Sequence, residues 1–282
     1  MKPLLKQSKT FILIGIFVAI AAYWGFLQFR GLANDSARNL IGDIYGSLAL
    51  AGGIFGLIVS KKWGGFRSLL GKSIIMLSIG LLLQEFGQLS YAYYVVVKHT
   101  DIPYPSIGDV GYFGSVIFYI YGAFLLSKVA GSSLSLRSVK NKFVALLLPL
   151  ALLMASYAIF LKGYEFDWSK PLPIILDFGY PLGQAVYLSI ALLALLLSRK
   201  ILGGLMRPKI ILILIALLIQ YVSDFNFLYQ NSHKTWVTAG YGDFLYFVSY
   251  LLMGLSLLNL SIPYVKADKS KVIPTEEDKN VG

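Results

Sequence analysis

Long apolar runs alternate with short polar segments along the whole chain. Eight of these runs are long enough to cross the hydrocarbon core of a bilayer as helices, which takes about 20 residues each. They lie near residues 11–29, 40–60, 73–97, 107–127, 143–161, 173–198, 210–230 and 242–262. A lipid-exposed backbone must satisfy its own hydrogen bonds, and the alternation of a β-barrel strand is missing. The pattern therefore predicts an all-α, polytopic membrane protein with eight transmembrane helices.

Composition agrees with this class and narrows the chemistry. Of the 282 residues, 57% are hydrophobic and 14% charged, as in multi-spanning proteins. The chain has no cysteine, which excludes disulfides, thiol catalysis and thiolate metal sites. Its two histidines, His99 and His233, fall in loops between runs. No nucleophile–base pair, phosphate loop or zinc-protease motif is visible, so we predict no catalytic residue, no metal and no cofactor.

Basic residues predict how the chain crosses the membrane. Nineteen of the 25 Lys and Arg lie in the N-terminus, the turns near 61–72, 128–142 and 199–209, and the tail after 262; the alternate loops hold the other six. By the positive-inside rule, both termini are cytoplasmic. The net charge of +11 is then an insertion signal, and nucleic acid is not an expected partner. Residues 1–262 form the transmembrane domain, with the first run retained, and 263–282 a disordered cytoplasmic tail.

An aspartate recurs at the predicted outer end of every second run. Asp43, Asp109, Asp177 and Asp243 are separated by 66, 68 and 66 residues, which predicts four helical hairpins. A shift of 134 residues also carries His99 onto His233. We therefore expect two parallel four-helix repeats, about 1–134 and 135–262. Each Asp is expected to cap its helix, and Ser106-x-x-Asp109 has capping-box spacing; as a ring the four could also meet a ligand.

Polar residues inside two runs are the candidate site. Glu85 lies in the third run with Gln84, Gln88 and Tyr91, and Asp224 lies in the seventh with Gln220 and Asn231. The spacings i, i+4, i+7 place a polar stripe on each helix. One interpretation is interhelical hydrogen bonding. The other is a polar cavity between the two helices, open to the outside, because intramembrane ionisable residues mark sites and pathways. With the rim aspartates, the candidate ligand-binding residues are Glu85, Gln84, Gln88, Tyr91, Asp109, Gln220, Asp224 and Asp243.

Two stretches carry a family resemblance. Tyr93-Tyr94 with Pro103-Tyr-Pro-Ser-Ile-Gly-Asp-Val-Gly-Tyr112, and Asp177-Phe-Gly-Tyr-Pro-Leu-Gly-Gln184, resemble the multi-helix membrane sensor region N-terminal to bacterial diguanylate cyclases and related signalling proteins. The resemblance covers most of residues 40–262 and implies a ligand- or membrane-sensing role. About 20 polar residues follow residue 262, so we expect no output domain there and a separate signalling partner on the cytoplasmic side.

The first functional hypothesis is thus a sensor-like integral protein of the cell membrane. It would bind a small ligand or a lipid headgroup in a polar cavity at its outer half, with the lipid bilayer as its constant partner. A small-solute or ion transporter or channel is the alternative, suggested by the parallel repeat and by Glu85. The lack of evident helix interruptions argues against transport, and a membrane-embedded enzyme is third because no catalytic set is visible.

Overall fold

The computed structural model describes residues 8–31, 35–100, 102–129, 139–197 and 206–261. Every regular element in these ranges is helical. The helices that correspond to the apolar runs are α1 Ser8–Arg30, α2 Asp35–Ile44, α3 Ser47–Lys62, α4 Leu69–Ala92, α5 Ile107–Val129, α7 Val139–Ser156, α8 Pro171–Leu197, α9 Met206–Ser232 and α10 Tyr241–Asn259. The predicted tail, 263–282, lies outside the described residues.

Eight of the helical segments in the described ranges are long and apolar enough to span a membrane, as predicted. The run predicted at 40–60 differs, because a turn at Tyr45 and Gly46 divides it into α2 and α3. At Gly46 the carboxylate of Glu85 presses against the backbone, and a Cβ there would lie 2.0 Å from Glu85 Oε2. The third and fifth runs end in π-helical turns, η2 Tyr93–Lys98 and η3 Tyr157–Leu161.

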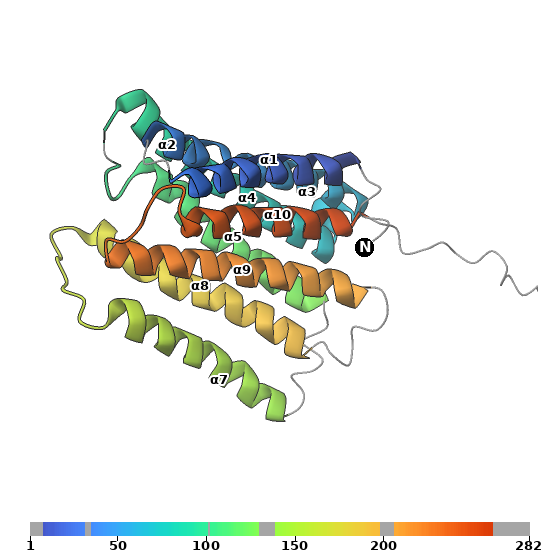
Figure 1. Ribbon diagram of the computed structural model, residues 1–282. Helices are drawn as coiled ribbons and strands as arrows, with labels where there is room; N and C mark the ends of the chain where they lie inside the picture. The colour runs from blue at the N-terminus through green and yellow to red at the C-terminus, as the bar shows by residue number, and fades with distance from the viewer. Residues whose placement is uncertain (1–7, 32–34, 101, 130–138, 198–205, 262–282) are drawn as a thin grey trace, which may run out of the picture.

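Of the described α-helices, six form a closed ring, and α1, α2 and α7 lie outside it. Around the ring, α3 contacts α4, α4 contacts α5, α5 contacts α8, α8 contacts α9, α9 contacts α10, and α10 returns to α3. Helix α1 packs on the outer side of α10 and α3, while α7 packs against α8 at the edge of the bundle (Figure 1). Because α4 and α9 stand on opposite sides of the ring, their polar stripes can face a shared interior.

The ring is tightest where α4 crosses α5. Gly87 of α4 lies against the ring of Tyr112, and a Cβ at Gly87 would come within 2.5 Å of that ring. A Cβ at Gly111 of α5 would meet the carbonyl oxygen of Leu83 at 2.5 Å. Without a hydrophobic driving force between helices in lipid, small residues that let backbones approach are a main source of packing energy. These glycines therefore fix the position of Tyr112 beside α4.

The two ends of the bundle differ in the segments they carry. One end holds the connections 99–106, 162–170 and 233–240; the other holds the turn 63–68 and both ends of the described chain. Ser8 and Ser261 lie close together at this second end, where they line one hollow with Lys62. An even number of helices long enough to span a membrane accounts for the two ends of the described chain lying at the same end of the bundle.

Candidate functional site

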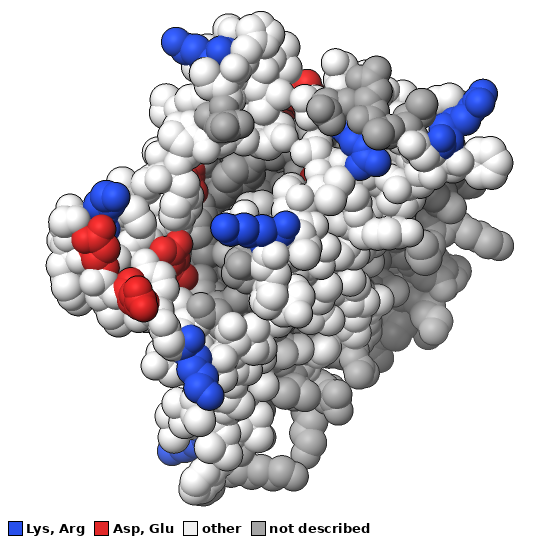
Figure 2. Space-filling view, turned by 60° about the vertical axis from the view of Figure 1, so that its left-hand side comes forward, with Lys and Arg blue, Asp and Glu red and all other residues white. Residues whose placement is uncertain are grey.

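A cavity of about 390 Å³ lies inside the ring and opens at the end that carries the loops 99–106 and 233–240. Figure 2 shows this end hollowed, with acidic residues within and beside the hollow. The lining comes from both halves of the chain: from α2, α4, α5, α8, α9, α10 and the two loops. Among the predicted site residues, those that line it are Gln84, Gln88, Tyr91, Asp109, Asp224 and Asp243.

One wall of the cavity is built by α4 and α5, and the hydrogen-bonded pairs that join these helices are neutral. Gln84 Nε2 donates to Ser115 Oγ at 2.7 Å, and the hydroxyl of Tyr112 donates to Gln88 Oε1. Gln88 also donates to the Gly42 carbonyl at 2.9 Å, which ties α2 to the wall. We call Gln84, Gln88, Tyr112 and Ser115 the amide wall.

The opposite wall is built by α9 and α10 and carries a carboxylate. Ser249 Oγ donates to Gln220 Oε1 at 2.5 Å, and the hydroxyl of Tyr246 donates to Asp224 Oδ1 at 2.9 Å. Asp224 Oδ1 also accepts from Gln220 Nε2 at 3.0 Å, and Oδ2 accepts from the Tyr187 hydroxyl of α8 at 3.2 Å. We call Gln220, Asp224, Tyr246 and Ser249 the acid wall. Gln220 itself lies behind Asp224 and does not line the cavity.

Aromatic rings close the inner end of the cavity. Tyr45, at the break between α2 and α3, stacks on Tyr246 and Tyr250 with centroids 6.4 and 6.0 Å apart. The hydroxyl of Tyr250 donates to Gln84 Oε1 at 2.9 Å. This bond crosses the ring of helices from α10 to α4. The tyrosine side chains and the two walls therefore form one connected polar and aromatic framework.

Two aspartates at the rim are held by tyrosines from other elements. Asp109 accepts from the Tyr180 hydroxyl of α8 at 2.8 Å. Asp177 accepts from the hydroxyls of Tyr104 at 2.5 Å and Tyr164 at 2.7 Å. The bond to Asp177 raises the pKa of Tyr164 to about 12, because the carboxylate disfavours a second negative charge. Burial and the same carboxylate raise the pKa of Tyr104 above its ordinary value.

The loop before α10 is fixed by Asp243 and α1. The backbone N–H of Ala239 donates to Asp243 Oδ2 at 2.6 Å. The carbonyl of Ala239 accepts from Trp24 Nε1 at 2.9 Å and from Gln28 Nε2 at 2.7 Å. Tyr91 reaches the same loop through Thr238, at 3.3 Å between their hydroxyl oxygens. Although α1 is outside the ring, it thus orders one lip of the cavity.

Capping accounts for only two of the four recurring aspartates. Asp109 accepts from the backbone N–H of Ser106 at 2.7 Å, the reach-back bond of the predicted capping box. Asp243 binds the backbone before α10 in a similar way. The capping interpretation is wrong for Asp177, whose carboxylate lies in the second turn of α8 and accepts from tyrosines. It is also wrong for Asp43, near the end of α2, whose Oδ1 is buried with no hydrogen-bond partner among the described residues.

Glu85 points into the protein but not into the cavity. It is 8% exposed and presses on Gly46 at the break between α2 and α3. Its Oε2 is buried without a hydrogen-bond partner in the described part of the chain. Gln84, Gln88 and Tyr91 lie on the same helix, but their side chains bond to other groups. Glu85 therefore lies behind the amide wall.

Most of the aromatic lining was missed from the sequence alone. The lining residues absent from our candidate set include Tyr45, Tyr104, Tyr112, Asp177, Tyr180, Gln184, Trp236, Thr238, Tyr246 and Tyr250. One available signal was the stretch 177–184, where Asp177, Tyr180 and Gln184 stand at helical spacing on one face of α8. The other was the recurrence of Tyr112-Phe113 as Tyr246-Phe247. Tyrosines near the outer ends of membrane helices also fit an interfacial belt, and their position in the sequence alone does not separate that role from lining a cavity.

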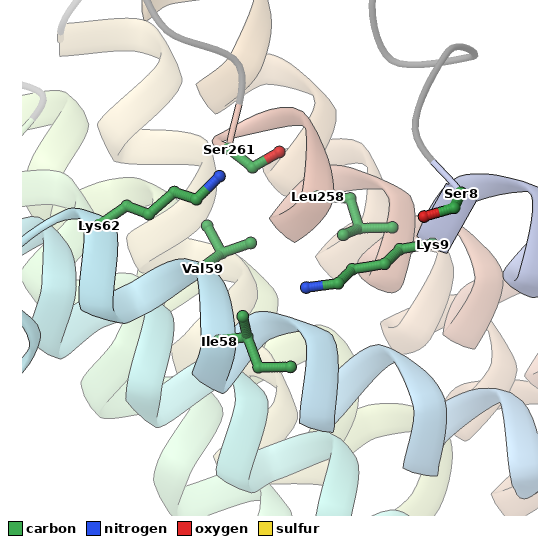
Figure 3. A pocket seen from close by; sticks show the side chains of 7 residues that line it. All are labelled: Ser8, Lys9, Ile58, Val59, Lys62, Leu258 and Ser261. Atoms are coloured by element: carbon green, nitrogen blue, oxygen red, sulfur yellow. The ribbon is translucent and has the colours of Figure 1, made fainter.

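A second hollow, of about 340 Å³, lies at the opposite end, between α1, α3 and α10. Figure 3 shows the ammonium groups of Lys9 and Lys62 reaching into it from two sides, with Ser8 and Ser261 at its rim. Its described lining contains no carboxylate and no aromatic ring. The two ends of the bundle therefore carry hollows of similar volume and opposite charge.

Comparison with models of known protein families, with curated proteins and with solved structures finds no match for this chain. Within the described ranges, no three His, Asp or Glu side chains are grouped so that they could hold a metal ion. The site must therefore be interpreted from its own chemistry: an internal cavity with carboxylate, amide and hydroxyl groups set among aromatic rings.

Proposed function

We propose that the chain is a sensor-like integral membrane protein that binds a small ligand in the cavity between the amide wall and the acid wall. The cavity itself is the main support for this proposal. Its volume falls within the range typical of small-molecule sites, and it combines apolar and aromatic surface with a few fixed polar groups. A framework built only for packing would bring these polar groups into direct contact instead of arranging them around a space. The binding site would respond to a solute at one face of the membrane.

The proposal includes an internal duplication, which the hydrogen bonds of the two walls support. A shift of 134 residues relates α5 to α10, and a shift of 136 relates α4 to α9. Under these shifts two bonded pairs recur: Gln84–Ser115 as Gln220–Ser249, and Gln88–Tyr112 as Asp224–Tyr246. Under this pairing, each contact between neighbouring helices of the ring corresponds to another contact of the ring, whereas α1 and α7 pack differently. The cavity would lie on the axis between the two repeats.

Binding in the cavity is tested by filling it. Gly42 lines the cavity, and a Cβ there meets Tyr91 and Thr238 at ordinary contact distances of 3.4 and 3.6 Å. Gly42→Phe should therefore fold and occupy the space. Purified protein is screened by thermal unfolding against a library of small probes, both charged and neutral. The matched control is Gly15→Phe on α1, where a Cβ meets nothing within 4 Å.

We expect some probes to raise the unfolding temperature of the wild type and of Gly15→Phe but not of Gly42→Phe, because a ligand that binds only the folded state stabilises it. The proposal is refuted if no probe stabilises the wild type, or if Gly42→Phe keeps the full response.

The proposed orientation places the cavity outside the cell and both termini in the cytoplasm. It rests on the six basic residues in the loops at the cavity end against 19 elsewhere. Lys170→Cys and Lys61→Cys place matched thiols in exposed segments at opposite ends. Because the chain has no native cysteine, a membrane-impermeant maleimide should label Lys170→Cys in intact cells and leave Lys61→Cys unlabelled. The reverse labelling would contradict this orientation.

A transporter remains the second candidate because of the break at Tyr45 and Gly46. Binding sites of transporters are often formed by discontinuous helices, and Tyr45 lines the cavity at such a point. Uptake of a radiolabelled probe that binds the cavity into proteoliposomes separates the two. Time-dependent accumulation in the lumen would favour transport, and saturable binding without accumulation would favour sensing.

A further inference from the structure

Asp224 is the only position at which the two walls differ in charge. In the amide wall, Gln88 accepts a hydrogen bond from the hydroxyl of Tyr112. In the acid wall, Asp224 accepts the equivalent bond from Tyr246. A neutral amide is therefore enough to hold such a helix pair together. Asp224 is 7% exposed, so its carboxylate loses most of its hydration. Burying this charge costs more free energy than burying a neutral amide. Packing alone does not account for a carboxylate at this position.

The partners of Asp224 leave its charge uncompensated. Its oxygens accept from Gln220, Tyr246 and Tyr187, which are all neutral donors. No lysine, arginine or histidine is among the described residues that line the cavity. A carboxylate has about four acceptor positions, so after three bonds Asp224 Oδ2 can accept one more. The open cavity is where a further donor could approach, since Asp224 itself lines it.

The surrounding rings favour a cation in the same space. The rings of Tyr45, Tyr246 and Tyr250 lie within 6.0 to 6.4 Å of one another, and Tyr246 also bonds directly to Asp224. Aromatic faces attract ammonium groups through their quadrupole, most strongly where water is excluded. A bare metal ion would instead need several oxygen, nitrogen or sulfur ligands, and within the described ranges no three His, Asp or Glu side chains are grouped so that they could hold one.

We propose that the cavity binds an organic ammonium ion, with the cationic nitrogen held by Asp224 and its apolar part among the tyrosine rings. This inference rests on the proposed function and adds the class of ligand. The ammonium group would donate to Asp224 Oδ2, which replaces the lost hydration of both charges. Gln88, in the opposite wall, would contact the ligand through a neutral amide.

The ammonium group could come from a free amine or from the headgroup of a lipid. The route into the cavity favours a free amine. Within the described ranges, each helix of the ring contacts the next one all the way round. The cavity instead opens among the loops at one end of the bundle (Figure 2).

The test uses two probes of nearly equal shape. Benzylammonium chloride carries the charge, and benzyl alcohol is its neutral counterpart; sodium chloride at equal concentration controls for ionic strength. Thermal unfolding and calorimetric titration are measured on the full chain in detergent and in nanodiscs of anionic, amine-free phosphatidylglycerol. The variants are Asp224→Asn and, as a second replacement that copies the amide wall, Asp224→Gln.

We expect benzylammonium, and not benzyl alcohol, to bind the wild type with saturation. Loss of a charge-assisted hydrogen bond should weaken its affinity in both variants by roughly tenfold to a hundredfold. Circular dichroism and gel filtration check that the variants fold. If neither variant folds, the comparison of benzylammonium with benzyl alcohol on the wild type still tests the inference, because equal stabilisation by both probes overturns it.

Equal binding to the wild type and to a folded variant also overturns the inference, as does a failure of benzylammonium to bind the wild type. In these cases the proposed function survives if neutral probes bind and Gly42→Phe abolishes their binding; it fails as well if nothing binds. To identify the source, we compare nanodiscs with and without phosphatidylethanolamine. A saturating stabilisation that appears only with the amine-bearing lipid, while soluble benzylammonium has no effect, would overturn the free-amine assignment.

Discussion

The amide wall and the acid wall use the same hydrogen bonds on opposite sides of one cavity. In each, a serine of one helix bonds a glutamine of the other, and a tyrosine hydroxyl bonds an acceptor one turn further along. The acceptor is Gln88 in the first wall and Asp224 in the second. The shared bonds hold helices together, which an amide does without charge. The single difference therefore separates what the framework needs from what the cavity adds.

The largest expected effect comes from breaking the framework on one side only. Gly87→Ala would bring a Cβ to 2.5 Å from the ring of Tyr112, so the tyrosine must move away from Gln88. Overpacking of this kind typically costs about 1–3 kcal/mol. Thermal unfolding of the purified protein should show a clear loss of stability. Gly114→Ala, on the same helix pair but with its nearest contact at 3.4 Å, is the matched control and should unfold near the wild-type temperature.

The second prediction moves the carboxylate from one wall to the other. Asp224→Gln makes the walls alike and should lose affinity for benzylammonium. Adding Gln88→Asp to that variant returns a carboxylate to the two walls, beside Tyr112 instead of Tyr246. A charge-assisted hydrogen bond contributes about 1.5–3 kcal/mol, and the double variant should regain a measurable part of it in a calorimetric titration. A double variant no better than Asp224→Gln would show that position, and not charge alone, decides binding.

A smaller effect is expected at Glu85, which lies behind the amide wall. Glu85→Gln keeps the shape of the side chain and removes its acidity, while the cavity lining stays intact. Benzylammonium should bind this variant as tightly as the wild type, in contrast to Asp224→Gln. Because Glu85 Oε2 has no described partner, stability should change by less than about 1 kcal/mol. A tenfold loss of affinity in Glu85→Gln would return Glu85 to the site.

The smallest effect should come from the rim. Tyr164 contributes its bond to Asp177 while its hydroxyl is protonated. Its pKa is raised from the ordinary 10 to about 12, so this contribution is complete below pH 10 and lost as the pH rises through 12. The carboxylate of Asp167 also raises the pKa of Tyr164. Tyr164→Phe should slightly lower the unfolding temperature at pH 8 and remove that part of the alkaline decline. An unchanged decline would place the titrating group elsewhere.

The number and type of the helices could be read from the sequence. Runs of about 20 apolar residues leave few alternatives in a bilayer, since only a helix satisfies the backbone locally. The stripes at 84–91 and 220–231 also predicted which faces turn inward, because helical periodicity is a local property. The position of a residue along its helix was less informative. Glu85 and Gln84 are adjacent in sequence, and both were candidates for the same cavity.

Only the tertiary structure separated these neighbours. Gln84 lies in the cavity and Glu85 behind it, because the break at Gly46 brings α2 and α3 against one side of α4. The pairing of Tyr45 with Tyr250, and of Tyr180 with Asp109, likewise depends on contacts of α3 with α10 and of α5 with α8. Such contacts join segments far apart in the chain, and hydropathy and spacing within a segment carry no information about them. The sequence by itself therefore determined a bundle of eight apolar helices with inward polar stripes, and the closure of the ring decided which of those groups share one space.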